Sequence, residues 1–218
     1  MELKNKKYIF FDLDGTVIDS KPGVFASLRY AFERMQLSDL TDAQLMPFLG
    51  PPLMESFAHF CGLDEQSAKQ AYAYFSDFYA KQGVGMNTLF AGVELAVKTL
   101  FENGKSIFLA TSKNEKHAAR ILEDHHLAQY FTDISGAVLA ENRSKKIEVL
   151  QHAMRKNRIT QRKKCLMIGD RKYDIAGAKL AGISAAGVLY GYGSRQELMD
   201  AGADVLFETA DDIVKCLI

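Results

Sequence analysis

Two aspartates follow a short apolar run near the N-terminus. Residues 8–11 (YIFF) are followed by Asp12 and, two positions later, by Asp14, with Gly15 directly after it. Residues two apart in an extended chain point to the same side, and Gly15 lets the backbone turn sharply beyond them. Two close carboxylates are costly to ionise together unless a cation lies between them. An acidic turn would explain Asp14 and Gly15 alone, but the whole pattern DLDGT indicates a functional site.

A second apolar run also ends in acids. Residues 165–168 (CLMI) and Gly169 precede Asp170, and Asp174 follows four positions later. Ligands of open parallel sheets bind beyond the carboxyl ends of the strands, so these acids are expected to face the first pair. Such oxygen ligands suit Mg²⁺, which also keeps places for water and a substrate phosphate. Taken alone, Asp174 could instead be an acid that stabilises a helix N-terminus.

Two further segments offer groups that could bind an anion. The apolar residues 107–110 lead to Thr111 and Ser112, where hydroxyls and the backbone amides of a starting helix would lie together. Residues 143–146 (RSKK) stand at the start of a predicted helix, where the helix dipole disfavours cations, so one lysine there is expected to bind another anion. The alternatives are a simple cap for Thr111 and a solvated face for the lysines.

Composition excludes several classes of protein. The 218 residues are 48% hydrophobic and 25% charged, which is typical of a globular protein with a sizeable core and excludes a disordered chain or a fibre. The 27 basic residues equal the 27 acidic ones, which argues against a nucleic acid polymer or a membrane surface as partner. Three distant cysteines indicate reduced thiols. Without an apolar run of the length of a signal or a membrane span, we expect a cytoplasmic protein.

The rest of the chain alternates short apolar runs with amphipathic segments. The runs that predict strands are residues 8–11, 106–110, 132–135, 165–168, 184–189 and 204–207. Several are continuously apolar, as in a sheet covered on both faces. Helical spacing follows between them, as in residues 93–101, which Gly104 would end as a left-handed cap, and after Ser144, which can cap the next helix. This rhythm predicts an α/β fold with a doubly wound, mainly parallel sheet.

One long stretch breaks the rhythm with helical patterns and no convincing strand. We interpret it as an inserted helical domain. The expected boundaries are residues 1–16 with 87–218 for the core and residues 17–86 for the insertion. Within the insertion, Thr41 and Gln44 have the spacing of a capping box. Residues 17–21 and 83–85 (GVG) are the expected hinges, since glycines absorb large backbone changes.

Four motifs occur in a fixed order along the chain. They are a strand followed by Asp12-x-Asp14-Gly15-Thr16, a strand followed by Thr111, Lys146 before a helix, and a strand followed by Gly169-Asp170 and then Asp174. This arrangement resembles the haloacid dehalogenase-like hydrolases over the whole chain. The insertion resembles the small helical cap of the phosphoglycolate phosphatase-like branch. Residues 48–53 (FLGPPL) and 169–171 (GDR) are similar to a bacterial subgroup with members described as 5′-nucleotidases. Val17 and Tyr173 replace the more usual Leu and His, away from the chemistry.

The resemblance implies a role for each of these residues. Asp12 would attack phosphorus and form an aspartyl-phosphate, while Asp14 would protonate the leaving oxygen and later deprotonate water. Asp12, the carbonyl of Asp14 and Asp170 would hold Mg²⁺. Asp174 would orient Lys146 or a metal-bound water. The residues expected to bind the phosphoryl group are Gly15, Thr16, Thr111, Ser112 and Lys146.

The resemblance therefore implies a Mg²⁺-dependent phosphatase. Its partner would be a small phosphorylated metabolite, of the phosphoglycolate or nucleoside monophosphate type, and the protein would be a monomer or homodimer. The insertion would close during the reaction, exclude water and select the substrate, while the sheet domain carries the chemistry.

Three alternatives differ from this interpretation. Sugar-phosphate mutases such as β-phosphoglucomutase use the same aspartyl-phosphate, but they carry a cap histidine near the position of Val24, and an aliphatic side chain cannot hydrogen-bond Asp14 to hold it inactive. A phospho-receiver domain shares the residue types, but it needs no insertion and its acidic pair precedes the phosphorylated aspartate. A non-catalytic binding protein is the third alternative, although every charged role is filled here.

Overall fold

The chain divides into two compact units. The computed structural model describes residues 2–218, and the first unit joins the N-terminal segment up to Ile18 with Leu89–Ile218, whereas Asp19–Thr88 form the second. The chain passes between the units twice. At these crossings the short strands β2 (Ile18–Asp19) and β3 (Thr88–Leu89) pair with each other.

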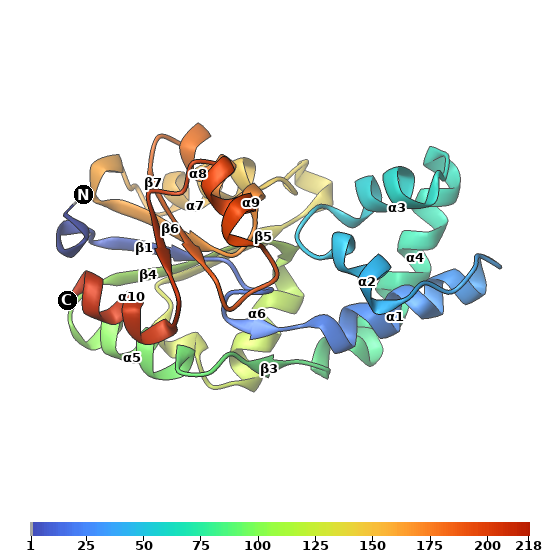
Figure 1. Cartoon of the computed structure of the whole chain (residues 1–218), viewed down its shortest axis with the longest axis horizontal. Helices are drawn as coiled ribbons and strands as arrows, with labels where there is room; N and C mark the ends of the chain where they lie inside the picture. Colours follow the sequence, from blue (N-terminus) through green and yellow to red (C-terminus); the bar gives the residue numbers. More distant parts are fainter. Residues whose placement is uncertain (1) are drawn as a thin grey trace. The chain divides into compact units, whose positions relative to one another are not determined.

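The first unit contains a six-stranded sheet in the order β5-β4-β1-β6-β7-β8. Its strands are β1 (Tyr8–Phe11), β4 (Ser106–Asn114), β5 (Asp133–Ala137), β6 (Cys165–Gly169), β7 (Ser184–Val188) and β8 (Val205–Phe207). Every neighbouring pair in this sheet is parallel. All carboxyl ends of these strands therefore meet at one edge, and β1 lies inside the sheet between β4 and β6 (Figure 1).

Helices cover both faces of this sheet. They are α5 (Val93–Glu102), α6 (Glu115–Asp124), α7 (Lys146–Lys156), α8 (Lys172–Leu180), α9 (Arg195–Asp200) and α10 (Ala210–Leu217). Short 3₁₀ helices lie at Leu3–Asn5, Ala128–Tyr130, Leu139–Glu141 and Arg162–Lys164. In Figure 1, α7 and α8 lie on one side of the sheet and α5, α6 and α10 on the other. The predicted α/β fold with a doubly wound, mainly parallel sheet is confirmed.

The apolar runs form strands because both of their faces are buried. On one face Phe10 stacks on Phe108 with ring centroids 4.9 Å apart, and Met167 joins the same cluster. Val149 and Leu150 of α7 and Ile175 of α8 close this layer. A strand covered on both sides needs apolar residues at successive positions, which is the pattern that predicted these strands.

The predicted strands agree with the structure in place but not always in length. β1 has the predicted bounds, whereas β4 continues four residues beyond its predicted end at Ala110 and includes Thr111. The two-residue strands β2 and β3 were not predicted, because pairs this short carry no periodicity.

The predicted cap of α7 was wrong. Lys145, and not Ser144, is the capping residue. The carboxylate of Glu148 accepts hydrogen bonds from the backbone N–H groups of Ser144 and Lys145 at 2.9 and 3.0 Å, so an acid in the first turn serves the helix start in place of a serine hydroxyl.

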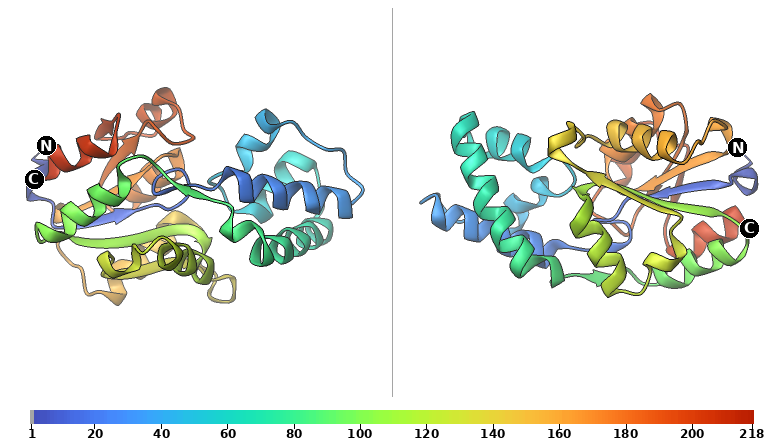
Figure 2. Two further views of the ribbon diagram at one scale, coloured as in Figure 1. Left: turned by 90° about the horizontal axis from the view of Figure 1, so that it is seen from below. Right: turned by 180° about the vertical axis from the view of Figure 1, so that it is seen from behind.

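The second unit is helical, with α1 (Lys21–Arg34), α2 (Asp42–Leu45), α3 (Leu53–Cys61) and α4 (Glu65–Lys81) (Figure 2). Its 3₁₀ helices are Met46–Phe48 and Gly83–Gly85. Phe32, Phe48 and Phe57 pack edge to face around one another, with centroids 5.9 to 6.3 Å apart. The predicted capping box is confirmed, since Thr41 N donates to Gln44 Oε1 at 3.0 Å.

The glycines expected to act as a hinge lie inside the second unit. Gly83–Gly85 form the 3₁₀ helix that packs against α1 and α4, and the N–H of Gly23 on α1 donates to the carbonyl of Met86 at 3.1 Å. One chain crossing, at Ile18–Asp19, falls within the other expected hinge at residues 17–21, and the second crossing lies at Thr88–Leu89. Among residues 2–218, no helix combines the length and apolar character that crossing a membrane requires.

Candidate active site

Three buried aspartates meet at the carboxyl edge of the sheet. Asp12 follows β1 and Asp170 follows β6, and these strands pair with Phe11 opposite Ile168. Asp174 lies in the first turn of α8. Each of the three offers a carboxylate oxygen within 4.8 Å of the others, and all three side chains are buried. The parallel register thus brings together acids that stand more than 150 positions apart in the sequence.

The ammonium of Lys146 lies among these acids. Its Nζ is 2.7 Å from Asp12 Oδ1 and 2.8 Å from Asp174 Oδ1, and it donates to the carbonyl of Ala110 at 2.8 Å. Lys146 is buried at the start of α7, whereas the neighbouring Lys145 is exposed. Of the two adjacent lysines, the structure therefore brings Lys146 to the acids.

The balance of charge in this cluster favours a cation. Burial, and then the charge of Asp174, raises the pKa of Asp12 to about 6, against the opposing effect of Lys146. Burial and the charges of Asp174 and Asp12 raise the pKa of Asp170 well above its usual range. Burial alone would lower the pKa of Lys146, but Asp12 and Asp174 outweigh it and raise that pKa. Three carboxylates share one ammonium, so ionised acids here exceed the local positive charge by two.

Asp12 Oδ1 gives a second reason to consider a cation. Although this oxygen lies 2.7 Å from Lys146 Nζ, it accepts no hydrogen bond of normal geometry from the described residues. A divalent cation with oxygen ligands would satisfy the orphaned oxygen and the excess negative charge together. The residues present therefore fit Mg²⁺.

Asp174 is engaged by both of its oxygens. Oδ1 faces Lys146, and Oδ2 accepts the backbone N–H of Arg171 at 3.0 Å. Such an arrangement holds the Asp174 carboxylate in one orientation and holds Lys146 between two acids.

The loop after Asp14 approaches Asp170 closely. Gly15 has a φ of +79°, and a Cβ on it would lie 2.1 Å from Asp170 Oδ2, so only glycine fits here. The buried Thr16 follows, with its Oγ1 3.4 Å from Asp170 Oδ1. Gly15 and Thr16 thus lie against the acidic cluster.

Thr111 and Ser112 stand in the extended part of β4. Thr111 is buried, and its Oγ1 accepts the backbone N–H of Lys113 at 3.2 Å, while Ser112 is half-buried. Ala110, next to Thr111, supplies the carbonyl that accepts from Lys146. The helix α6 begins only at Glu115, so Thr111 precedes the helix start by more residues than the sequence suggested.

Sequence reasoning missed three residues at this edge. Lys113 Nζ lies 2.9 Å from both carboxylate oxygens of Asp14. The backbone N–H of Tyr192 donates to Asp170 Oδ2 at 2.8 Å, and the hydroxyl of Tyr190 donates to the carbonyl of Thr16 at 3.1 Å. The run Tyr190–Gly193 (YGYG) could have indicated the two tyrosines, because it begins two residues after the carboxyl end of β7.

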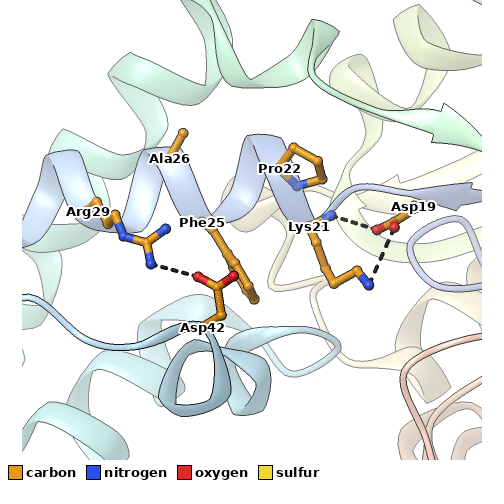
Figure 3. Close-up of a pocket in the computed structure, with 7 residues that line it drawn as sticks. All are labelled: Asp19, Lys21, Pro22, Phe25, Ala26, Arg29 and Asp42. Atoms are coloured by element: carbon orange, nitrogen blue, oxygen red, sulfur yellow. Dashed lines mark hydrogen bonds and ion pairs between the residues drawn. The ribbon is translucent and has the colours of Figure 1, made fainter.

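The second unit has a pocket of its own, of about 440 Å³ (Figure 3). It is lined by Asp19, Lys21, Pro22, Phe25, Ala26, Arg29 and Asp42. Arg29 pairs with Asp42 at 2.7 Å, and Lys21 pairs with Asp19 at 3.4 Å. The pocket therefore presents two ion pairs around a mostly buried Phe25. Val24, the next residue back on α1, is buried.

Comparisons with known proteins agree with this geometry. A family model described as haloacid dehalogenase-like hydrolase matches residues 9–188. A 5′-nucleotidase of Pseudomonas aeruginosa is 34% identical over 190 residues, which are 87% of this chain and 86% of that protein. A phosphoglycolate phosphatase of Vibrio vulnificus is 30% identical, covering 97% of this chain and 94% of that protein.

Two further proteins are similar to this chain. A tyrosine-protein kinase, PtkA, of Mycobacterium tuberculosis is 34% identical over 90% of this chain and 66% of that protein. The crystal structure of a "predicted phosphatase" from Clostridium acetobutylicum has a TM-score of 0.93 and 35% identity, covering 96% of this chain and 97% of that one.

Mg²⁺ is expected to stabilise the protein more at pH 7.5 than at pH 5. Because burial raises the pKa of Asp12 to about 6, the metal-free folded chain holds a proton there that the unfolded chain releases at lower pH. The contribution of this bound proton to the free energy of unfolding is fully present at acidic pH and is lost as the pH rises through about 6. Mg²⁺ has to displace the proton, so it binds better above that pH.

The measurement is the Tm with a chelator and with Mg²⁺ at both pH values. At roughly 100 times Kd, Mg²⁺ should raise the Tm by about 5–10 °C at pH 7.5 and by much less at pH 5. Asp170→Asn, which removes one charge with little change in volume, is the control and should abolish most of the shift. An equal shift at both pH values would contradict the expectation.

Gly177→Ala should lower stability, although alanine ordinarily stabilises a helix interior. A Cβ at Gly177 in α8 would lie 2.8 Å from Lys146 Cγ and 2.9 Å from Lys146 Cβ, which are not the mobile end of that side chain. We expect the free energy of unfolding to fall by about 1–3 kcal/mol, as in other overpacked sites. Urea denaturation measures it, with the exposed neighbour Ala176→Gly as control, where only helix propensity changes, by about 1 kcal/mol. A more stable Gly177→Ala variant would disprove the close packing.

Proposed function

This chain belongs to the haloacid dehalogenase-like hydrolases and is a phosphatase of that family, and we propose that it hydrolyses a small phosphomonoester through an aspartyl-phosphate with the help of Mg²⁺. The substrate class follows the relatives whose names are 5′-nucleotidase and phosphoglycolate phosphatase. We place the reaction in the cytoplasm, in keeping with the three free cysteines.

The observation that carries the proposal is the position of Asp12. This carboxylate follows β1, is buried, and lies 2.7 Å from the ammonium of Lys146, with Asp170 beside it. A buried carboxylate next to a cation and a cation site is suited to attack phosphorus, because the charge of an incoming phosphate is offset there.

Asp12, Asp170 and the carbonyl of Asp14 would hold the metal ion. When bound, Mg²⁺ offsets the repulsion between a carboxylate nucleophile and an anionic phosphate. Asp174 has both oxygens engaged by Lys146 and Arg171, which supports a role in orienting Lys146 over a role as a ligand.

Asp12 and Asp14 would divide the chemistry. A carboxylate oxygen of Asp12 bonds to phosphorus as the bond to the leaving oxygen breaks, and Asp14 gives that oxygen a proton. In the second half, Asp14 takes a proton from water as the water oxygen bonds to phosphorus. The bond between Asp12 and phosphorus then breaks, which releases inorganic phosphate and restores both acids.

The other residues of the motifs would hold the phosphoryl group. Lys146 supplies positive charge, and Thr111 and Ser112 supply hydroxyl and backbone donors. Gly15 and Thr16 would add backbone N–H groups from the loop that lies against Asp170. Lys146 Nζ lies within 2.8 Å of oxygens of Asp12, Asp174 and the carbonyl of Ala110, so a bound phosphate would replace one of these protein oxygens.

We propose that the helical insertion, which we expect to span residues 17–86, acts as the cap that excludes water and selects the substrate. Its own pocket at Asp19, Lys21 and Arg29 offers paired charges for this selection.

Val24 on α1 is a buried aliphatic residue, which supports a phosphatase over a sugar-phosphate mutase.

Purified protein is expected to release inorganic phosphate from small phosphomonoesters when Mg²⁺ is present, and Asp12→Asn should reduce this to background. The amide has nearly the volume of the acid but is no nucleophile. The assay is phosphate release from a panel that contains phosphoglycolate, nucleoside monophosphates and hexose phosphates. Asp14→Asn is the comparison, since it should slow both halves of the reaction and leave the nucleophile in place.

Three results would count against this function. They are near-normal hydrolysis by Asp12→Asn, interconversion of hexose phosphates with a bisphosphate activator much faster than phosphate release, and transfer of phosphate from ATP to tyrosine in place of hydrolysis. The second result would indicate a mutase. The third would indicate the reaction in the name of one relative.

Lys146→Ala should reduce turnover far more than Lys145→Ala. Lys146 is buried between Asp12 and Asp174, whereas Lys145 is exposed, so only the first removal leaves buried acids without a counter-charge. Loss of one such electrostatic group commonly costs about 10²–10³-fold in kcat. The kcat of both variants measures the difference, and a greater loss in Lys145→Ala would transfer the role to that residue.

A further inference from the structure

Lys113 holds the carboxylate of Asp14 by both of its oxygens. Nζ is 2.9 Å from Oδ1 and 2.9 Å from Oδ2, and the two side chains are only 8% and 17% exposed. An ion pair so sheltered is weakly screened by solvent, unlike the surface pairs of this chain. It therefore fixes the orientation of Asp14.

A bulge in β4 directs Lys113 toward Asp14. Ala110 pairs with Ser135 of β5 and Asn114 pairs with Ala137, so residues 111–113 stand opposite Gly136 alone. Such a bulge adds residues to one strand and re-aims their side chains. A Cβ at Gly136 would lie 2.8 Å from the carbonyl oxygen of Lys113, so glycine there allows the bulge to fit against β5.

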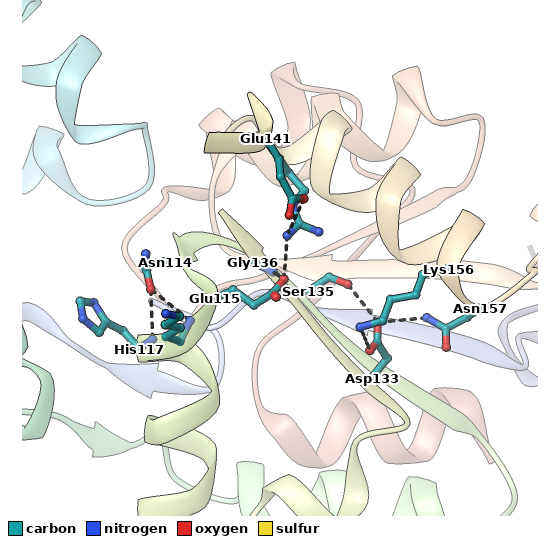
Figure 4. Close-up of polar contacts among 11 residues, drawn as sticks. Asn114, Glu115, His117, Asp133, Ser135, Gly136, Glu141, Lys156 and Asn157 are labelled. Carbon is teal, nitrogen blue, oxygen red and sulfur yellow. Dashed lines mark hydrogen bonds and ion pairs between the residues drawn. The ribbon is translucent and has the colours of Figure 1, made fainter. Parts of the chain in front are cut away.

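Glu115 and Arg143 hold the end of the bulge. Oε2 of Glu115 accepts from the backbone N–H of Gly136 and from Arg143 NH2, both at 3.0 Å. The side chain of Arg143 is only 6% exposed, and its NH2 lies 3.4 Å from Glu141 Oε2. In Figure 4, Glu115 lies next to Gly136, and Glu141 lies above them in the view. The chain thus fixes the backbone from which Lys113 projects.

We propose that Lys113 is a positioning residue for Asp14 in the hydrolytic reaction. This inference rests on the proposed function, in which Asp14 exchanges a proton with the leaving oxygen and then with water. A carboxylate has two oxygens, so while one exchanges the proton the other keeps its contact with the ammonium. Lys113 thereby keeps Asp14 in the orientation that both proton transfers require.

The proposal predicts a dependence on the leaving group. An aryl phosphate such as p-nitrophenyl phosphate releases a stable anion and needs no proton in the first half of the reaction, whereas an alkyl phosphate releases an alkoxide and does need one. Hydrolysis of the aspartyl-phosphate needs Asp14 with either substrate. A misplaced Asp14 therefore affects only the second half with the aryl substrate and both halves with the alkyl substrate.

The test compares Lys113→Met with Lys116→Met in rapid-mixing experiments on the Mg²⁺-loaded protein. Lys116 is exposed and lies three residues further on, so its variant removes the same charge without touching Asp14. For Lys113→Met we expect the first turnover of p-nitrophenyl phosphate to stay near wild type and the steady-state kcat to fall by about 10- to 100-fold, with accumulated phosphoenzyme. With an alkyl phosphate the first turnover should fall as well.

Lys113→Arg provides a rescue, since a guanidinium can also hold both oxygens of a carboxylate. It should recover part of the lost kcat, and circular dichroism must show that each variant is folded. An equal loss in the first turnover of both substrates would overturn the proposal in favour of a structural ion pair. A raised KM with unchanged kcat would overturn it in favour of a substrate-binding cation. Failure of the proposed function is distinct, because wild-type protein would then release no phosphate from either substrate.

Discussion

Three buried carboxylates gather around one buried ammonium in this protein, and the rest of the fold has to hold them there. Asp12, Asp170 and Asp174 have lost most of their water, and the ammonium of Lys146 lies between Asp12 and Asp174. Desolvated like charges are unfavourable, and the raised pKa values of Asp12 and Asp170 express this. The surrounding fold must therefore supply the free energy that holds the acids together. It does so through the apolar layers of the sheet, in which Ile9–Phe11 of β1 and all of β6 are buried.

Close packing then decides how near the groups can come. The loop at Gly15 lies against Asp170, and Gly177 of α8 leaves room for the stem of Lys146. Both positions exclude any larger residue, since a Cβ would fall inside contact distance. The same principle acts at Gly136, where the bulge of β4 rests on β5. Close packing around the site thus keeps the like-charged carboxylates near one another.

Much of this arrangement could be predicted from the sequence, and the reasons for the failures are physical. Continuous apolar runs located the strands because both faces of the sheet are covered, and acids after those runs located Asp12 and Asp170. The end of β4 was missed because residues 111–114 (TSKN) are polar and still extended, held by a bulge that only the partner strand defines. Lys113 was missed for the same reason, since its contact with Asp14 depends on a bulge and not on periodicity. The start of α7 depends on the carboxylate of Glu148, which lies in the first turn of the helix and accepts from the backbone there. The general preference for serine as a capping residue does not reveal this contact.

The central place of β1 also has a consequence for how the chain is made. Tyr8–Phe11 leave the ribosome before both of their neighbours, which are β4, starting at Ser106, and β6, starting at Cys165. The first of these pairings closes a loop of about a hundred residues, and the second closes a longer one, so the entropic cost delays both. Until β6 has been synthesised, the apolar strand β1 has at most one edge paired. Nascent chains that stop before residue 165 must therefore carry this strand with an open edge, which exposes them to aggregation and to the holding action of chaperones.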